Sequence, residues 1–329
     1  MQNQGRIDAM TRKIAFIIDP LPALDPAKDS SIAMMLAAQY RGWEVHTIQQ
    51  ADLFCSSDGA SMQVHADSEI IRLEPPRSAG GWYHSISRQR IALSGLDVVM
   101  MRKDPPFDME YINTTYLLDL AAQAGVLVVN PPAALRDFNE KLFITRFPQC
   151  CTPMLVSRDP ARLRAFVEQH GDVIIKPLDG MGGAEIFRLT PDDANLSVIL
   201  ETASRGGGKT LMAQLYIPAI KQGDKRILLI DGEPVPYALA RIPAQGETRG
   251  NLAAGGSGKG VELSERDRWI CSQLSDTLKA EGILFAGIDV IGDYLTEINI
   301  TSPTCIRELD RQYSLDIAGD LMDAIAARL

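Results

Sequence analysis

The chain has 329 residues, of which 46% are hydrophobic and 23% charged, a composition typical of globular proteins rather than disordered or fibrous ones. This length predicts two or three compact units. A formal net charge of −9 excludes non-specific attraction to nucleic acid or to an anionic membrane, so we expect neither as a partner. A small anionic ligand would need a basic pocket of its own.

The cysteines and the N-terminus indicate the compartment in which the protein works. The five cysteines are odd in number and have no C-x-x-C spacing, so we expect neither a disulfide framework nor a thiolate metal site. Residues 1–12 lack the apolar core of a signal peptide, and no later run approaches ~18 apolar residues. The sequence therefore predicts a cytoplasmic protein.

The first ~136 residues alternate between strand and helix patterns. The predicted elements are, in order, a strand at 14–18, a helix at 30–40, a strand at 43–48, a strand at 96–101, a helix at 110–124 and a strand at 126–130. This alternation indicates a parallel α/β domain. The loop after the first strand, DPLPALDPAKDSS, is rich in proline where a dinucleotide fold needs glycine. A dehydrogenase is therefore not favoured.

A basic segment follows the strand at 96–101. Ligands of open parallel sheets bind beyond the carboxyl ends of the strands, and Arg102, Lys103 and Asp104 lie at that position. We interpret this segment as a candidate anion site.

From residue 137 onward the pattern becomes α+β. It predicts a helix around 140–147, a strand at 154–157, a helix at 161–170 closed by Gly171, and then mostly hairpins, one of them turning at Asp231-Gly232.

The strongest local signal is a glycine-rich turn between two strands, at 172–178 and 184–190. Gly180, Met181, Gly182 and Gly183 follow Lys176 by a few residues. Glycines let backbone N–H groups approach phosphate oxygens closely, and a lysine on the strand supplies a positive charge. The alternative is a tight turn that only requires positive φ. The nearby lysine favours the phosphate site.

A second signal lies in the sequence ILFAGIDVIGDYLTEINIT at 283–301. A three-residue hairpin loop at 292–294 would place Asp289 opposite Glu297, and alternation puts Asn299 on the same face as Glu297. Two opposed carboxylates repel each other unless a cation lies between them, and Mg²⁺ prefers oxygen ligands. The alternative is a solvated strand face.

Two other glycine-rich stretches have weaker patterns. GGGKT at 206–210 is not a P-loop, because Ala203 stands where the motif needs glycine and a strand pattern follows, so we expect a surface loop. The stretch 242–260 holds six glycines around Arg249 and predicts a mobile lid that excludes water from a reactive phosphorylated intermediate. An inert insertion is the alternative.

Long strings of this sequence resemble bacterial glutathione synthetase, a family of the ATP-grasp superfamily. They cover the chain from about residue 13 to its end and include MRKDPPFD (101–108), RDFNEKLF (136–143), IIKPLDGMGGAEIFR (174–188), MAQLYIP (212–218), GETRGNLAAGG (246–256) and LTEINITSPTCIRE (295–308).

The resemblance implies an N-terminal α/β domain followed by a two-lobed ATP-grasp fold. The implied division is an extension at 1–12, the N-terminal domain at 13–136, a central lid domain at 137–215 and a C-terminal domain at 216–329 with the mobile loop 242–260. It also implies the ATP-dependent joining of γ-glutamylcysteine to glycine through an acyl phosphate, giving glutathione, ADP and phosphate. Two Mg²⁺ ions, replaceable by Mn²⁺, and a homotetramer are further implications.

The resemblance also implies site residues. The expected ATP contacts are Lys141, Lys176, Gly180, Met181, Gly182, Gly183, Gln214, Leu215, Tyr216, Ile217, Asp224, Arg226, Arg241 and Asn299. The expected peptide and glycine contacts are Arg102, Arg249, Asn251, Gly255, Gly256, Ser302, Pro303 and Thr304. Asp289, Glu297 and Asn299 would bind the metal ions, and Arg241 and Arg249 would be catalytic.

Two alternatives stay open at this point. One is another ATP-grasp ligase with a different acceptor, such as a D-alanine or glutamate ligase. The other is a nucleotide-binding regulatory protein without catalysis, which predicts damage at Lys176, Asp289, Glu297 or Asn299, and all four are intact.

Overall fold

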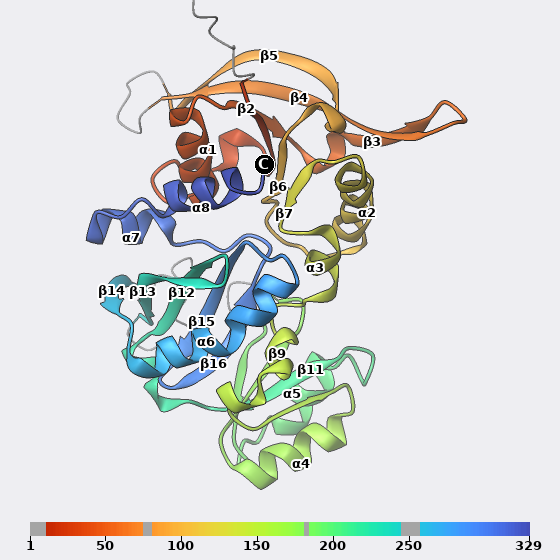
Figure 1. The fold of residues 1–329 in the computed structure, drawn as a ribbon. Coiled ribbons are helices and arrows are strands. Elements are labelled where there is room, and N and C mark those ends of the chain that lie inside the picture. Colours follow the sequence, from red (N-terminus) through yellow and green to blue (C-terminus); the bar gives the residue numbers. More distant parts are fainter. Residues whose placement is uncertain (1–10, 75–80, 181–183, 245–256) are drawn as a thin grey trace, which may run out of the picture.

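A computed structural model of the protein describes residues 11–74, 81–180, 184–244 and 257–329. Figure 1 shows three sheets, with the N-terminal sheet and its helices at the top, a second sheet in teal and blue below it, and a third, green sheet at the bottom. Among the described residues, no helix is both long enough and apolar enough to cross a membrane.

The N-terminal sheet contains the predicted parallel strands. β1 (Lys13–Ile17), β2 (Glu44–Ile48), β6 (Val98–Met101) and β7 (Leu127–Val129) are parallel and lie in the order β2-β1-β6-β7. The helices α1 (Ser30–Tyr40) and α2 (Met109–Gln123) connect them. Both helices begin at an aspartate, because the carboxylates of Asp29 and Asp108 accept hydrogen bonds from the first backbone N–H groups. A short helix, α3 (Pro132–Asp137), follows β7.

Three further strands of this sheet come from a segment for which the sequence predicted no unit. β3 (Leu53–Ser57), β4 (Met62–Leu73) and β5 (Tyr83–Ala92) are antiparallel, with β4 joining the sheet beside β2 and pairing with β5 along its other edge. The predicted parallel sheet is thus extended by an antiparallel ribbon.

The third, green sheet holds the glycine-rich turn. Its elements are β8 (Met154–Ser157), α4 (Pro160–His170), β9 (Val173–Pro177), β10 (Phe187–Leu189), α5 (Leu196–Ala203) and β11 (Leu211–Leu215), and its strand order is β10-β9-β11-β8. The predicted hairpin is present, because Phe187 lies opposite Ile175. Its core is formed by residues of α4 and α5, including Leu163, Val167 and Leu200.

The predicted helix at 140–147 is wrong. The segment contains only a 3₁₀ turn at Phe143–Arg146. The side chain of Asn139 accepts hydrogen bonds from the backbone N–H groups of Lys141 and Leu142 at 3.0 and 3.1 Å, as at the start of a helix, but the segment continues only as this short turn. Pro148 then limits any continuation.

The second sheet is antiparallel throughout. It contains β12 (Asp224–Ile230), β13 (Glu233–Ile242), β14 (Ser257–Glu262), β15 (Phe285–Ile291) and β16 (Tyr294–Asn299) in the order β14-β13-β12-β15-β16. The helix α6 (Glu265–Ala280) buries Ile270, Leu274 and Leu278. The turn between β12 and β13 is Asp231-Gly232, as predicted, and both residues have positive φ.

The glycine-rich stretch 242–260 is shorter as a loop than predicted. Its last residues, from Ser257 to Gly260, belong to β14 and pair with β13, while residues 245–256 lie outside the described part of the chain. At Gly260 a Cβ atom would lie 2.2 Å from the ring of Tyr313. This glycine therefore permits close packing of a strand against a helix.

The C-terminal helices return to the N-terminal sheet. α7 (Ile306–Tyr313) and α8 (Ile317–Ala326) lie beside α1, as Figure 1 shows, and Leu321 and Met322 share one buried cluster with Met34 and Met35. The C-terminal helices are thereby held in one core with α1.

Asn130, which directly follows β7, joins the first and second sheets. Its side-chain amide donates to the carbonyl oxygens of Phe285 and Ile300 at 2.7 and 2.6 Å. Its side-chain oxygen accepts from the backbone N–H groups of Leu284 and Phe285 at 2.9 and 3.0 Å. This buried side chain thus uses all four hydrogen bonds that an asparagine amide can make.

Candidate active site

The core of the site is a row of charged residues across three strands of the second sheet. Antiparallel register places Arg226 of β12 opposite Asp289 of β15, and Asp289 opposite Glu297 of β16. The sequence therefore predicted the pairing of Asp289 with Glu297 correctly.

The hairpin that makes this pairing differs from the predicted one. Its loop has two residues, Gly292 and Asp293, because Tyr294 already pairs with Ile291. A β-bulge at Thr296 adds the residue that restores the register between Asp289 and Glu297. The bulge also frees the carbonyl oxygen of Thr296, which accepts a hydrogen bond from Lys176 Nζ at 3.1 Å.

Asp289 is held by two arginines. Its two carboxylate oxygens accept from Nε and Nη2 of Arg226 at 2.5 and 2.8 Å, and Arg241 Nη2 lies 2.8 Å from Oδ2. Arg241, on β13, also donates to Asp224 Oδ2 at 2.5 Å. Bidentate pairing of this kind fixes the planes of both partners.

Burial and charge act in opposite directions on these carboxylates. Burial alone would raise the pKa of Asp289, but the guanidinium groups of Arg226 and Arg241 hold that pKa well below its usual range. Burial raises the pKa of Asp224 to about 6, against the opposing effect of Arg241. For Lys176, a cation, burial lowers the pKa, although the carboxylate of Glu297 opposes the shift.

Two buried polar atoms of this network lack a partner within the described part of the chain. They are Asp224 Oδ1, an acceptor, and Arg241 Nε, a donor. A buried polar group without a hydrogen bond costs free energy, so both atoms indicate positions where a bound ligand completes the network. An acceptor suits a sugar hydroxyl, and a donor suits a phosphate oxygen.

Glu140 is a residue of this site that the sequence analysis missed. One of its carboxylate oxygens contacts Lys141 Nζ, and the other accepts from the Asn299 amide at 3.0 Å when that amide is oriented to satisfy both of its neighbours. Burial and the nearby Glu297 raise the pKa of Glu140. Its position immediately before Lys141 was the available signal, but only the fold brings it to Asn299.

The charges of the cluster balance. Four cations, Lys141, Lys176, Arg226 and Arg241, face four carboxylates, those of Glu140, Asp224, Asp289 and Glu297. A nucleoside triphosphate brings about four negative charges, which the carboxylates would repel unless divalent cations entered with it.

The residues fit divalent cations shared with a ligand. Among the described residues, no group of three His, Cys, Asp or Glu side chains is arranged to hold a metal ion alone. Mg²⁺ commonly binds to one or two carboxylates together with substrate phosphates. Asp289, Glu297 and Asn299 supply oxygen ligands of that kind on neighbouring strands.

On the N-terminal side, Arg102 meets the segment predicted to contact the peptide. This buried side chain donates to Ser31 Oγ at 3.1 Å, to the carbonyl oxygen of Pro303 at 3.0 Å and to that of Thr301 at 3.5 Å. No described carboxylate forms an ion pair with it. A buried guanidinium with only neutral partners among the described residues is a candidate binding position for an anion.

Asp19, to which the sequence analysis gave no role, and Asp104 connect the N-terminal sheet to the segment after β16. Asp19 Oδ1 pairs with Lys103 Nζ at 2.8 Å, and its other oxygen accepts from the backbone N–H of Asp104. Asp104 in turn accepts from Ser302 Oγ at 2.8 Å. Lys103 is therefore neutralised inside the protein, and Arg102 remains as the candidate of this segment for binding an anion.

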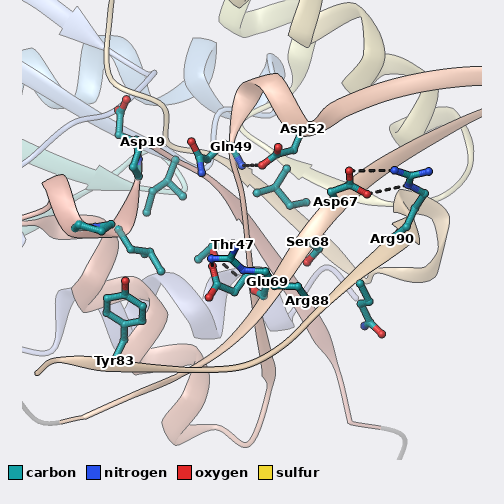
Figure 2. Close-up of a pocket in the computed structure, with 16 residues that line it drawn as sticks. Asp19, Thr47, Gln49, Asp52, Asp67, Ser68, Glu69, Tyr83, Arg88 and Arg90 are labelled. Atoms are coloured by element: carbon teal, nitrogen blue, oxygen red, sulfur yellow. Dashed lines mark hydrogen bonds and ion pairs between the residues drawn. The ribbon is translucent and has the colours of Figure 1, made fainter. Parts of the chain in front are cut away.

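Asp19 also borders a cavity of about 590 Å³ on the N-terminal sheet, shown in Figure 2. The ends of β1 and β2 and the β4–β5 ribbon surround it. Its charged side chains already have partners: Arg90 binds Asp67, Arg88 binds Glu69, and Asp52 accepts from the backbone N–H of Gln49. Because these charges are paired within the wall, we assign no ligand to this cavity.

The remaining predicted residues are only partly placed. Gln214 is buried on β11, and Leu215, Tyr216 and Ile217 continue towards Asp224 of β12. Gly180 is described, and its carbonyl oxygen accepts from Lys141 Nζ at 2.7 Å. Thr304 lies directly after Pro303. Outside the described residues lie Met181, Gly182, Gly183, Arg249, Asn251, Gly255 and Gly256.

The buried charged cluster lies between two antiparallel sheets, each of which packs against helices, and an N-terminal α/β domain lies beside them. This arrangement defines an ATP-grasp protein. A solved structure described as a Chryseobacterium gregarium RiPP-associated ATP-grasp ligase in complex with ADP and a leader and core peptide matches this fold, with a TM-score of 0.65, 16% identity and coverage of 97% of this chain and 98% of that one.

The chain belongs to the prokaryotic glutathione synthetase family. Residues 12–136 match the model of the prokaryotic glutathione synthetase N-terminal domain, and residues 140–314 match that of its ATP-grasp domain. The glutathione synthetase of Pseudomonas putida is 56% identical over 320 residues, 97% of this chain and 99% of that protein. That of Vibrio cholerae is 55% identical over 317 residues, 96% and 98% of the two chains. An ATP-grasp ligase with a different acceptor is not favoured.

Proposed function

We propose that this site carries out the reaction of the family, in which ATP drives the joining of γ-glutamylcysteine to glycine with release of ADP and phosphate. The protein is an ADP-forming carboxylate–amine ligase. The observation that carries the assignment of roles is a pair of buried atoms, Asp224 Oδ1 and Arg241 Nε, which have no partner among the described residues and belong to a cluster whose charges balance.

The nucleotide occupies the space between the second and third sheets. Lys141 and Lys176 contact its phosphates, joined by Arg226, Arg241 and the glycine turn at 180–183. Asp224 accepts a hydrogen bond from the ribose, and Gln214 to Ile217 line the adenine. These roles are supported by burial of both lysines and both arginines around one point of the fold.

Asp289, Glu297 and Asn299 would hold two Mg²⁺ ions, which Mn²⁺ can replace. The oxygen atoms of these three side chains on neighbouring strands, and the balance of charges in the cluster, support this role. When bound, these ions neutralise phosphate charge and polarise the transferring phosphoryl group. Arg226 and Arg241 hold the carboxylate of Asp289 in a fixed plane, so the ligand set is oriented before the nucleotide binds.

The peptide lies towards the N-terminal sheet. Arg102 binds a carboxylate of γ-glutamylcysteine, and the segment Ser302-Pro303-Thr304 lines the same pocket, together with Asn251, Gly255 and Gly256. A carboxylate does not react with an amine at neutral pH, so its cysteinyl carboxylate first takes the γ-phosphoryl group of ATP, giving an acyl phosphate and ADP. The glycine nitrogen then attacks the carbonyl carbon, and phosphate leaves.

In this reaction no side chain forms a covalent bond to the substrate. Arg241 and Arg249 stabilise the negative charge that develops on the phosphoryl and acyl oxygens, and alignment of the reactants supplies much of the remaining rate. We further propose the division into 1–12, 13–136, 137–215 and 216–329, a cytoplasmic location in keeping with five free cysteines, and a homotetramer.

The decisive experiment is to measure ADP release from the purified protein with Mg-ATP and γ-glutamylcysteine, with and without glycine, and to identify the peptide product by mass spectrometry. We expect glycine-dependent ADP release with glutathione formed in equal amount. Turnover with another carboxylate and amine, and none with this pair, would reject the assigned substrates.

A further inference from the structure

The glycine-rich segment at 206–209 has no role in the proposed reaction. It connects α5 to β11, and its backbone N–H groups are bonded within the turn itself. Gly206 N donates to the carbonyl oxygen of Glu201 at 2.8 Å, and Gly207 N and Lys209 N donate to that of Ser204 at 3.1 and 2.7 Å. These N–H groups are therefore not free to bind phosphate, as those of a P-loop would be.

The turn places Lys209 beside the glycine-rich turn of the neighbouring hairpin. β11 pairs antiparallel with β9, so that Leu211 lies opposite Pro177. Lys209 precedes Leu211 by two residues and Asp179 follows Pro177 by two, so these two residues come to lie next to each other. Lys209 Nζ is 2.9 Å from Asp179 Oδ1 and 3.3 Å from Glu185 Oε2. The ammonium group of one mostly buried lysine side chain thus contacts a residue on each side of the segment 180–184.

Glu185 needs such a restraint. Its φ is +57°, in the left-handed region that residues with a side chain rarely adopt. The ion pair with Lys209 stabilises this conformation, and the hydrogen bond from Lys209 lowers the pKa of Asp179. The two carboxylates are more than half exposed, so the lysine provides the fixed, protected end of the contact.

Two other hydrogen bonds hold the N-terminal side of this segment, and on its C-terminal side the pairing of β10 with β9 begins at Phe187. Asn139 Nδ2 donates to the carbonyl oxygen of Leu178 at 3.0 Å, and Lys141 Nζ donates to that of Gly180. In the proposed function Lys141 turns to the nucleotide phosphates. Lys209 is engaged by two carboxylates and has no phosphate contact in the proposed function.

We propose that Lys209 is a positioning residue of the nucleotide site, which fixes Asp179 and Glu185 and thereby sets the distance between the two sides of the glycine-rich turn. The proposal deepens the proposed function and rests on the phosphate-binding role given there to this turn. Lys209 acts through the two carboxylates and does not itself contact ATP.

The test compares Lys209→Met, Lys209→Arg and Asp179→Asn in the full-length protein. We expect Lys209→Met to raise both the Kd of Mg-ATP, measured by calorimetry without peptide, and the KM for ATP about fivefold, the size of a partly exposed ion pair. The KM values for γ-glutamylcysteine and glycine stay unchanged, and Lys209→Arg restores ATP binding. Lys279→Met is the matched control, because it removes a 2.6 Å ion pair with Glu233 far from the nucleotide.

Asp179→Asn distinguishes positioning from direct contact. If Lys209 positions the turn, Asp179→Asn weakens ATP binding, and the double variant with Lys209→Met is no weaker than the stronger of the two single variants. Tighter ATP binding by Asp179→Asn would mean that a released Lys209 contacts phosphate, which overturns the proposal. An unchanged Kd in Lys209→Met, or equal changes in all three KM values with a lower Tm, would also overturn it.

Failure of the proposed function would look different. In that case the unmodified protein binds Mg-ATP but forms no glutathione, and the Kd series on the three variants still decides the role of Lys209.

Discussion

Lys176 Nζ lies 3.1 Å from the carbonyl oxygen of Thr296, the residue that the β-bulge between β15 and β16 leaves unpaired. The same ammonium group is 3.6 Å from Glu297 Oε1. One local irregularity therefore keeps Glu297 opposite Asp289 and supplies a neutral acceptor for a buried cation. Removing the charge of Glu297 would test the site without disturbing this backbone.

Glu297→Gln should abolish turnover while preserving the fold. The amide keeps the shape of the carboxylate but loses the charge that a divalent cation requires, so we expect kcat to fall by about 10²-fold or more with little change in Tm. Steady-state kinetics across a range of Mg²⁺ concentrations, with exposed Glu233→Gln as the control, measures this. Near-normal activity would reject Glu297 as a metal ligand.

Arg102→Lys should weaken peptide binding selectively. A lysine cannot reach Ser31, Pro303 and a substrate carboxylate together, because it lacks the planar fork of the guanidinium. We expect the KM for γ-glutamylcysteine to rise about tenfold and the Kd of Mg-ATP to stay the same. A rise in the ATP constant alone would place Arg102 in the nucleotide site instead.

Asn130→Asp should destabilise the contact between the first and second sheets. A carboxylate cannot donate to the carbonyl oxygens of Phe285 and Ile300 and would be repelled by both. We expect the free energy of unfolding to fall by about 3 kcal/mol in urea titrations. The control is Asn113→Asp, an exposed position on α2. Equal stability of the two variants would contradict the role of Asn130 as a connection between sheets.

Asp310→Asn should stabilise the protein at alkaline pH. Burial, together with the nearby Asp316 and Asp320, raises the pKa of Asp310 from 3.8 to about 6. An acid whose pKa is raised by folding costs stability above the folded pKa, and that cost disappears as the pH falls towards the unfolded value. The gain should therefore grow between about pH 4 and 6, level off above pH 6 and reach about 1 kcal/mol, after allowance for partial solvent exposure.

Thermal unfolding at several pH values measures this change. The amide oxygen of the variant can still accept the hydrogen bond that Asp310 receives from Ile317 N, so the backbone contact is retained. Asp276→Asn, on the exposed face of α6, controls for the loss of one surface charge. A gain that is constant between about pH 4 and 6 would contradict the raised pKa.

The parts of the fold that could be predicted from the sequence are single strands and short hairpins. Alternation and turn residues predicted β1, β2, β6, β7, the hairpin at Asp231-Gly232 and the opposition of Asp289 to Glu297, because these depend on periodicity and short loops. The same rules failed at 140–147, where Pro148 limits the segment to a short 3₁₀ turn, and at 83–92, where β5 is largely exposed and has no buried apolar face to reveal it.

The sequence by itself determined the family, the glycine turn, and the strand-borne lysine, arginines and carboxylates, since each depends on residue identity and local spacing. Only the tertiary structure decided which charges meet. Glu140 reaches Asn299, Lys209 contacts Asp179 and Glu185, and Asn130 joins two sheets, because these contacts span 24 to 170 residues of chain. No local pattern encodes contacts of that length; the packing of the three sheets creates them.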